Sequence, residues 1–538
     1  MRKKRKVHAI AARVGAIGAA VTLAGLGAAA VPAHAAGPDL GFTPITTNAL
    51  PCTAGPGLPA FASALTPAQL MQAYDPATPV NAPATSNFVG TENDMIALSP
   101  DGTFLYTVSE NTASDGITRL TLTGPNTGKK ELLAYDPVAG GTPIWSRVDG
   151  SKWYPYGGPG THGAGVLLVS EEFATGGIWQ INPDTGAFVR LDWLGNLSHE
   201  GVGLDAAGNL YIGDENRTGA IYKGVPNNKN DLTLGGTLYY MVGTGIDPTG
   251  WKAVVNPLNA ITEASSNGAI LFDRPEDFDE RNGRVYFTVT EPAGDSDPRK
   301  GSYAPGGDAT KNQVVNRGGV YSLNTIGVPD LAVQSGAAPY VKLTPMIEVQ
   351  DPLYATQTDA QNQQGLQFPD NITFDGRGHL WVHEDIPDGA TATFPNAVDV
   401  SKQVRNQQDE MYVYELNATG DAIVANPDPT GPGISKGYKV ADMRTSTPVA
   451  AGPGVPATYN TTHACENEFT GGQFAADGVT LYVNQQHWAN PTLKLVLPDT
   501  PPPVLPETTV VALMSASALV VLGGGAFVIK RRRGLTIA

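Results

Sequence analysis

Short hydrophobic runs that each end in an acidic or amide side chain repeat six times between residues 105 and 487. The copies read LYTVSEN, LLVSEEF, LYIGDENR, VYFTVTE, LWVHED and LYVNQQH. Turns rich in Asp, Asn and Gly precede several of them, namely SPDGT, DAAGN, ERNGR, FDGRGH and AADGV. Because these residue types favour tight hairpins, each copy predicts a β-strand entered through a hairpin turn.

The spacing of these strands predicts the fold class. Further strands follow several copies, as in IWQINPDTG, AIYKGVP, GVYSLN and MYVYELN. Repeats of this length are typical of propeller blades, which expose equivalent positions to one central axis. We therefore expect an all-β protein with a six-bladed β-propeller over residues 87–495, and long loop insertions after Glu291 and Asp385.

The acidic strand ends are the first candidates for a functional site. If equivalent positions converge on the axis, their carboxylates gather without matching cations, and such a ring requires metal ions. The candidates are Glu110, Glu171, Glu172, Asp214, Glu215, Glu291, Glu384 and Asp385, with Gln485 and Gln486 in the last copy.

Segments between the repeats add further candidates, each with a simpler structural explanation beside it. His199-Glu200 offers an imidazole and a carboxylate, although a lone His-Glu pair is weak evidence. Arg274 lies among carboxylates and suits a phosphate, or else forms a surface salt bridge. Oxygen ligands that suit calcium also occur before the fifth and sixth runs. These are Asp370, Asn371 and Glu468. For the Asp-Asn pair before the fifth run, an Asx turn is the alternative explanation.

Four segments in order resemble the PhoX-type alkaline phosphatase family. They are SHEGVGLDAAGNLYIGDENR with IYKGVP, RPEDFDERNGRVYFTVTE with GGVYSLN, FPDNITFDGRGHLWVHED, and ENEFTGGQFAADGVTLYVNQQH. The resemblance covers most of residues 90–488. It implies a six-bladed propeller with a central cluster of calcium and iron that hydrolyses phosphate esters.

By motif, the resemblance also implies roles for individual residues. It places metal ligands at Glu172, Glu200 and Glu276 and a phosphate-contacting arginine at Arg274. Glu110 matches the family's N-terminal NHE segment less closely. Further ligands or supports fall at Asp214, Glu215, Asp370, Asn371 and Asp385. If the protein is an enzyme, His199 or His162 is the candidate that donates a proton to the leaving group, a role inferred from residue type and not from the resemblance.

The chain departs from the family in its cysteines. Ser170 stands where the family has a cysteine before the paired glutamates, and a hydroxyl is a poorer ligand for ferric iron than a thiolate. The family's Asn-Cys-Ala-Gly-Gly stretch is replaced by YPYGGPGTHGAG, in which His162 is the candidate substitute. Calcium is therefore the expected metal, and an altered, iron-free site is the expected variation.

The net charge of −16 argues against nucleic acid as a partner, because phosphate backbones bind to a surplus of Lys and Arg. Such a charge suits divalent cations, although an acidic, solvated surface is also common in exported proteins. Cys52 and Cys465 could form one disulfide that ties the N-terminal segment to the last blade, or remain as two thiols.

The chain ends predict export and attachment at the cell surface. Residues 1–35 read as a signal peptide, and residues 36–86 lead into the propeller. A Pro-rich spacer with LPETT fills residues 496–509, and an apolar helix with a basic tail fills residues 510–538. This order resembles a sortase sorting signal of Gram-positive surface proteins, with Thr509 in place of Gly. The alternative is a plain membrane anchor.

The function expected is therefore that of a monomeric, cell-surface, metal-dependent phosphatase that acts on small phosphate esters. Two alternatives remain at this point. One is a calcium-stabilised surface module without catalysis, and the other is a calcium-dependent lactonase-type hydrolase, since propellers host that chemistry as well. Phosphate affinity at Arg274 distinguishes them, because neither alternative requires it.

Overall fold

 Every residue that the computed structural model describes belongs to the unit Asp39–Ala538, and these residues cover only part of it. The described residues are 60–61, 65, 68–71, 93–110, 116–135, 145–158, 163–216, 219–244, 247–290, 314–315, 318–325, 342–348, 366, 368–385, 410–424, 437–442, 468–486 and 492–498. The predicted signal peptide, LPETT motif, anchor helix, His162, Glu291, Cys52 and Cys465 lie outside them.

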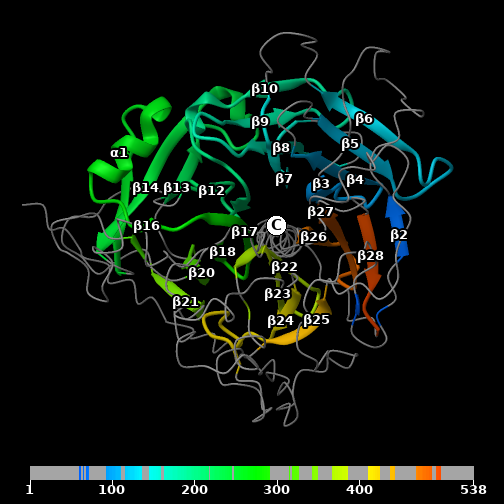
Figure 1. Cartoon of the computed structure of the whole chain (residues 1–538). Helices are drawn as coiled ribbons and strands as arrows, with labels where there is room; N and C mark the ends of the chain where they lie inside the picture. The colour runs from blue at the N-terminus through cyan, green and yellow to red at the C-terminus, as the bar shows by residue number, and fades with distance from the viewer. Residues whose placement is uncertain are drawn as a thin grey trace, which may run out of the picture. The chain divides into compact units, whose positions relative to one another are not determined.

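Six sheets, antiparallel except for one parallel strand pair at the edge of blade 3, form the blades of a propeller, as the sequence predicted (Figure 1). Blade 1 holds β3 (Asn93–Leu98), β4 (Phe104–Ser109), β5 (Gly116–Thr121) and β6 (Lys130–Tyr135). Blade 2 holds β7 (Val148–Tyr154), β8 (Val166–Glu171), β9 (Ile178–Ile181) and β10 (Phe188–Arg190). Blade 3 holds β11 (Val202–Leu204), β12 (Leu210–Gly213), β13 (Gly219–Pro226), β14 (Gly236–Thr244) and β15 (Asp247–Ala253), joined by β16 (Leu271–Phe272) and β19 (Val314–Val315).

The other three blades complete the ring. Blade 4 holds β17 (Pro275–Arg281), β18 (Arg284–Val289), β20 (Gly319–Asn324) and β21 (Leu343–Glu348). Blade 5 holds β22 (Pro369–Phe374), β23 (Leu380–Glu384), β24 (Glu410–Tyr414), β25 (Tyr438–Asp442) and β1 (Ala60–Phe61). Blade 6 holds β26 (Glu468–Phe474), β27 (Thr480–Gln486), β28 (Thr492–Val496) and β2 (Ala68–Met71).

The repeated runs of the sequence are the second strands of the blades, β4, β8, β12, β18, β23 and β27. The predicted Asx and Gly turns join each inner strand to this second strand in five blades. In the turn of blade 1, for example, Asp101 Oδ1 accepts hydrogen bonds from Ser99 Oγ at 2.6 Å and Thr103 N at 2.9 Å. Such local side-chain bonds fix the turn, so the hairpins could be predicted from sequence.

Hydrophobic side chains pack at each junction between neighbouring blades. Between blades 1 and 2, for example, Tyr106 stacks on Trp153 with ring centroids 6.0 Å apart. Between blades 3 and 4, the ring centroids of Phe272 and Phe287 lie 5.3 Å apart. Six such clusters occur among the described residues, one for each junction. Burial of this apolar surface holds the blades against one another.

The N-terminal segment closes the ring by strand pairing. β2 pairs antiparallel with β28 as the outer strand of blade 6, and β1 pairs antiparallel with β25 in blade 5. Helices are few in the described part of the chain: α1 (Ala260–Ser266) and the short 3-10 helices η1 (Asp192–Leu194), η2 (Leu232–Leu234) and η3 (Pro257–Asn259). None of the described helices has the length and apolar character needed to cross a membrane.

Candidate active site

One carboxylate from each blade lies on its innermost strand or within two residues before it. All six are buried. We call them the ring carboxylates: Asp94, Asp149, Glu200, Glu276, Asp370 and Glu468. The pairing of inner and second strands is interrupted around four of them, at Asn93/Ile96, Val148/Ser151, Pro275/Phe278 and Pro369/Ile372. Such bulges redirect side chains, which explains how these acids leave the blade cores.

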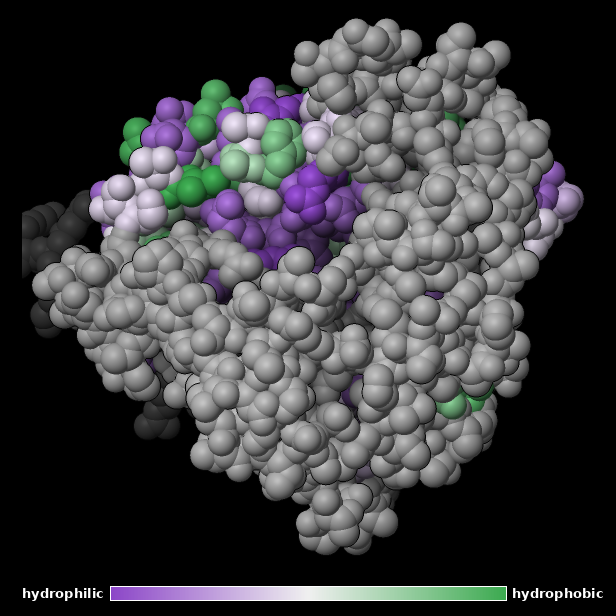
Figure 2. Space-filling view, in the orientation of Figure 1, coloured by the Kyte–Doolittle hydropathy of each residue, from purple (hydrophilic) through white to green (hydrophobic). Residues whose placement is uncertain are grey.

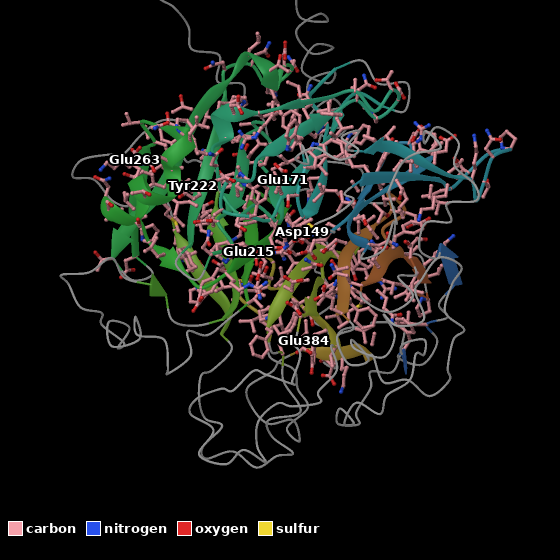
Figure 3. The ribbon with its side chains drawn as sticks, turned by 45° about the horizontal axis from the view of Figure 1, so that its top comes forward. Asp149, Glu171, Glu215, Tyr222, Glu263 and Glu384 are labelled. Atoms are coloured by element: carbon pink, nitrogen blue, oxygen red, sulfur yellow. The ribbon has the colours of Figure 1, made fainter. Side chains whose placement is uncertain are left out.

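Five of the six ring carboxylates, together with Glu110, form two compact groups, and Glu468 belongs to neither. The first group is Asp94, Glu110 and Asp149, and the second is Glu200, Glu276 and Asp370; within each, one oxygen per residue lies within 4.8 Å of the others. Figure 3 labels Asp149 and Glu215 in this central region. On the face seen in Figure 2, the described residues near the axis are mainly hydrophilic.

Burial raises the pKa of every ring carboxylate, and neighbouring carboxylates raise most of them further. The pKa of Asp94 rises to about 7, through burial and then the charge of Glu110. The pKa of Glu276 rises to about 8, through burial, although Arg274 opposes the shift. Asp149 Oδ1 has no hydrogen-bond partner among the described residues. Clustered acids of this kind fit divalent cations, whose charge would reverse these shifts.

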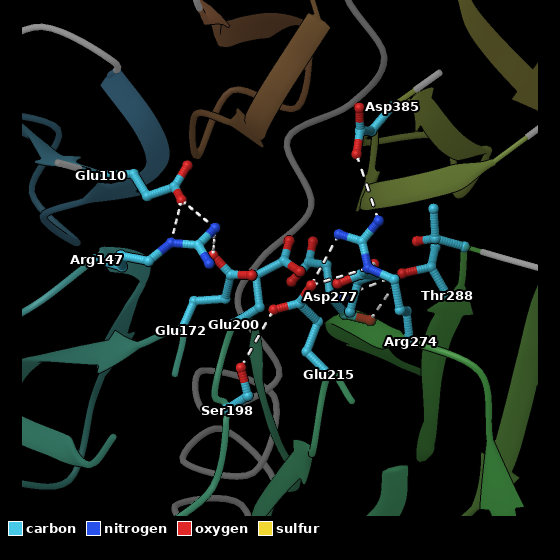
Figure 4. Close-up of polar contacts among 12 residues, drawn as sticks. Glu110, Arg147, Glu172, Ser198, Glu200, Glu215, Arg274, Asp277, Thr288 and Asp385 are labelled. Atoms are coloured by element: carbon cyan, nitrogen blue, oxygen red, sulfur yellow. Dashed lines mark hydrogen bonds and ion pairs between the residues drawn. The ribbon is translucent and has the colours of Figure 1, made fainter. Parts of the chain in front are cut away.

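Arg274 connects three blades at the edge of the second group (Figure 4). Its Nε and Nη2 donate to Glu215 Oε1 at 2.9 and 2.8 Å, and its Nε lies 3.1 Å from Glu276 Oε1. Its Nη1 lies 3.8 Å from Asp385 Oδ2. The side chain is 23% exposed, so the guanidinium is held by carboxylates but still accessible.

Asn371 and Ser170 hold Glu200 in place. Asn371 Nδ2 donates to Glu200 Oε1 at 3.1 Å, while Asn371 Oδ1 accepts from Gly471 N at 2.6 Å. Ser170 Oγ donates to the carbonyl oxygen of Glu200. Ser170, which replaces the family's cysteine, therefore contacts backbone, and the described donors of both carboxylate groups are oxygen atoms.

Three predicted candidates have at least one carboxylate oxygen that accepts hydrogen bonds from protein donors, although Asp214 Oδ2 accepts none within the described residues. Glu171 accepts from Ser146 N and Gly177 N at 3.0 Å each and from Trp179 Nε1 at 2.8 Å. Glu384 Oε2 accepts from Glu410 N at 3.0 Å. Asp214 Oδ1 accepts from Ser198 N at 3.3 Å and Asn216 Nδ2 at 2.5 Å, and burial raises its pKa to about 7. These acids brace the blades around the site.

The remaining candidates divide between the centre and the blade interior. Glu172 contacts Arg147, and Glu468 is a ring carboxylate whose pKa is raised by burial and then by Asp385. His199 is fully buried, and burial lowers its pKa to about 3. Neither ring nitrogen of His199 makes a hydrogen bond of ordinary geometry within the described residues.

Sequence reasoning missed Asp94, Asp149 and Arg147. Arg147 Nε and Nη2 donate to Glu110 Oε1 at 2.8 and 2.5 Å, and Nη2 also contacts Glu172. One signal was available: Arg147 and Asp149 have the same spacing as Arg274 and Glu276.

Comparisons with known proteins agree with this architecture. Residues 174–488 match the family model described as alkaline phosphatase PhoX. The structure is similar to that of Pseudomonas fluorescens PhoX in complex with vanadate, with a TM-score of 0.50, 15% identity, and coverage of 86% of this chain and 99% of that one. It is also similar to a gluconolactonase from Xanthomonas campestris, with a TM-score of 0.40, 10% identity, and coverage of 86% and 98%. No curated protein matched the sequence.

Proposed function

Because the chain belongs to the alkaline phosphatase PhoX family, we propose that it is a cell-surface phosphatase that hydrolyses phosphate monoesters with calcium at the centre of its propeller. The observation that carries this proposal is the pairing of a buried carboxylate group with Arg274. A structural calcium site has no need of an arginine in its midst, whereas phosphate recognition does.

The donor set fits a hard divalent cation. Glu200, Glu276 and Asp370 would hold one ion, and Asp94, Glu110 and Asp149 would hold another. Oxygen donors of this kind suit calcium, and the absence of a thiolate from the described groups disfavours the iron of the family resemblance. Bound cations supply charge neutralisation for the phosphoryl oxygens and acidify a water molecule.

The protein's own residues bind and orient the ester. Arg274 binds a non-bridging phosphoryl oxygen, and Glu215 fixes its guanidinium plane. Asn371 fixes the carboxylate of Glu200. His199 is a poor proton donor at alkaline pH, because its lowered pKa leaves the ring neutral.

Hydrolysis of an aryl phosphate at alkaline pH tests this proposal. The full chain should turn over substrate with calcium, lose activity in a chelator and regain it when calcium returns. Arg274→Ala should lose about 100-fold or more in kcat/KM, the scale for one transition-state donor. Arg190→Ala is the matched control, since Arg190 bonds to Asp192, Gly176 and Asn196 and belongs to neither carboxylate group. Absence of turnover by the wild type, or full activity of Arg274→Ala, would contradict the proposal.

Cell-surface attachment rests on the two chain ends. We propose that residues 1–35 direct export and that the LPETT segment is joined to the cell wall by a sortase. Release of the protein by a wall-degrading enzyme, but not by detergent, is expected. Release by detergent alone would instead indicate a membrane anchor.

A further inference from the structure

Two arginines occupy equivalent positions in blades 2 and 4. Arg147 and Arg274 each stand two residues before a ring carboxylate, Asp149 and Glu276. Both have left-handed backbones, with φ of 52° and 55°. Their carbonyl oxygens accept equivalent hydrogen bonds, from Glu172 N at 2.9 Å and from Thr290 N at 3.0 Å. Phe368 has the same conformation two residues before Asp370, with φ of 43°, so this backbone belongs to the inner strands of three blades and puts the two arginines at equivalent points around the axis.

A pair of carboxylates lies between these arginines. Arg147 contacts Glu172, Arg274 contacts Glu215, and Glu172 adjoins Glu215 closely enough that the two interact. Figure 4 shows both guanidinium groups directed toward the carboxylates between them. The two cations therefore border one continuous central site.

Arg147 is the more open of the two. Its side chain is 40% exposed, compared with 23% for Arg274. Its Nη1 makes no hydrogen bond to any described residue, while Nε and Nη2 are held by carboxylates. A guanidinium fixed on one edge and open on the other can bind a further oxyanion. Arg147 also lies outside the segment that matches the family model.

We propose that Arg147 binds a second phosphoryl group of the substrate, so that the enzyme favours phosphoanhydrides and other compounds with two phosphoryl groups over simple monoesters. This inference rests on the proposed phosphatase function. Arg274 would bind the phosphoryl group that is cleaved, while Arg147 binds the one that stays on the leaving group.

Steady-state kinetics with ADP and phenyl phosphate test the proposal. Arg147→Met should raise KM for ADP at least about tenfold more than it raises KM for phenyl phosphate, the factor for one charge-assisted hydrogen bond. Arg190→Met is the matched control and should change neither. Equal losses on both substrates would mean that Arg147 only neutralises Glu110 and Glu172, and would overturn the proposal.

If Arg147→Met folds poorly, a binding measurement on the wild-type protein tests the proposal without the variant. Calorimetric titration of calcium-loaded wild-type protein should give methylenediphosphonate, which cannot be hydrolysed, at least about tenfold tighter binding than methylphosphonate. Equal affinities would overturn the proposal. Wild-type turnover of phenyl phosphate separately tests the phosphatase function, so the two failures are distinguishable.

Discussion

Substitution of Asn371 tests whether its two hydrogen bonds hold the second carboxylate group together. Asn371→Ala removes the donor to Glu200 Oε1 and leaves Gly471 N buried without its acceptor. A bond to a charged carboxylate contributes about 1.5–3 kcal/mol, and an unpaired buried donor costs about 1–3 kcal/mol. We therefore expect the free energy of unfolding to fall by about 3–5 kcal/mol in calcium, where Glu200 is ionised.

The variant Asn371→Asp distinguishes the contribution of the bond to Glu200 from that of the bond from Gly471 N. It keeps an acceptor for Gly471 N but places a carboxylate beside Glu200. At pH 8 in chelator it should be the less stable of the two variants, because nothing neutralises the added charge. In calcium Asn371→Ala should be the less stable.

Urea unfolding in calcium and in chelator measures both effects, with the exposed Asn227→Ala as control, for which a change within about 0.5 kcal/mol is expected. The same loss for both Asn371 variants under both conditions would refute the reasoning.

Three further predictions concern pH, His199 and the inner strand of blade 2. Without metal, the raised pKa values of Asp94, about 7, and Glu276, about 8, mean that the folded state binds more protons than the unfolded one, so stability should fall as pH rises from about 4 to 8. Calcium should remove this slope in urea unfolding, and a slope of opposite sign in chelator would contradict it. His199→Leu should leave the shape of the pH–rate profile unchanged, because the ring is already neutral; loss of its alkaline limb would restore His199 as a proton donor. Gly150→Ala should destabilise the protein by about 3 kcal/mol in urea unfolding, because its Cβ would overlap Ser170 Oγ and the Glu200 carbonyl oxygen, and a neutral result would be inconsistent with that packing.

The blade repeat could be predicted because hairpin turns are encoded locally. The ring carboxylates could be predicted only in part, since their direction depends on bulges that no single segment encodes. Glu200, Glu276, Asp370 and Glu468 were found, but Asp94 and Asp149 lie in segments without a comparable motif.

Alternation along a strand explains the paired acids. In the pair Glu171-Glu172, Glu171 accepts a hydrogen bond from Trp179 Nε1 in the interior of the blade, while Glu172 contacts Arg147 in the central site. Successive side chains of a strand point to opposite faces, so only one member of such a pair can face the centre.

The pairing of β2 with β28 sets an order for the appearance of activity. The ring carboxylates run from Asp94 in the first blade to Glu468 in the last, and the last blade is complete only when the early strand β2 joins it. A chain interrupted before β26 would lack Glu468, and one interrupted before β28 would still lack this closure. The enzyme should therefore gain its metal ions late, after the whole propeller has been made, rather than blade by blade.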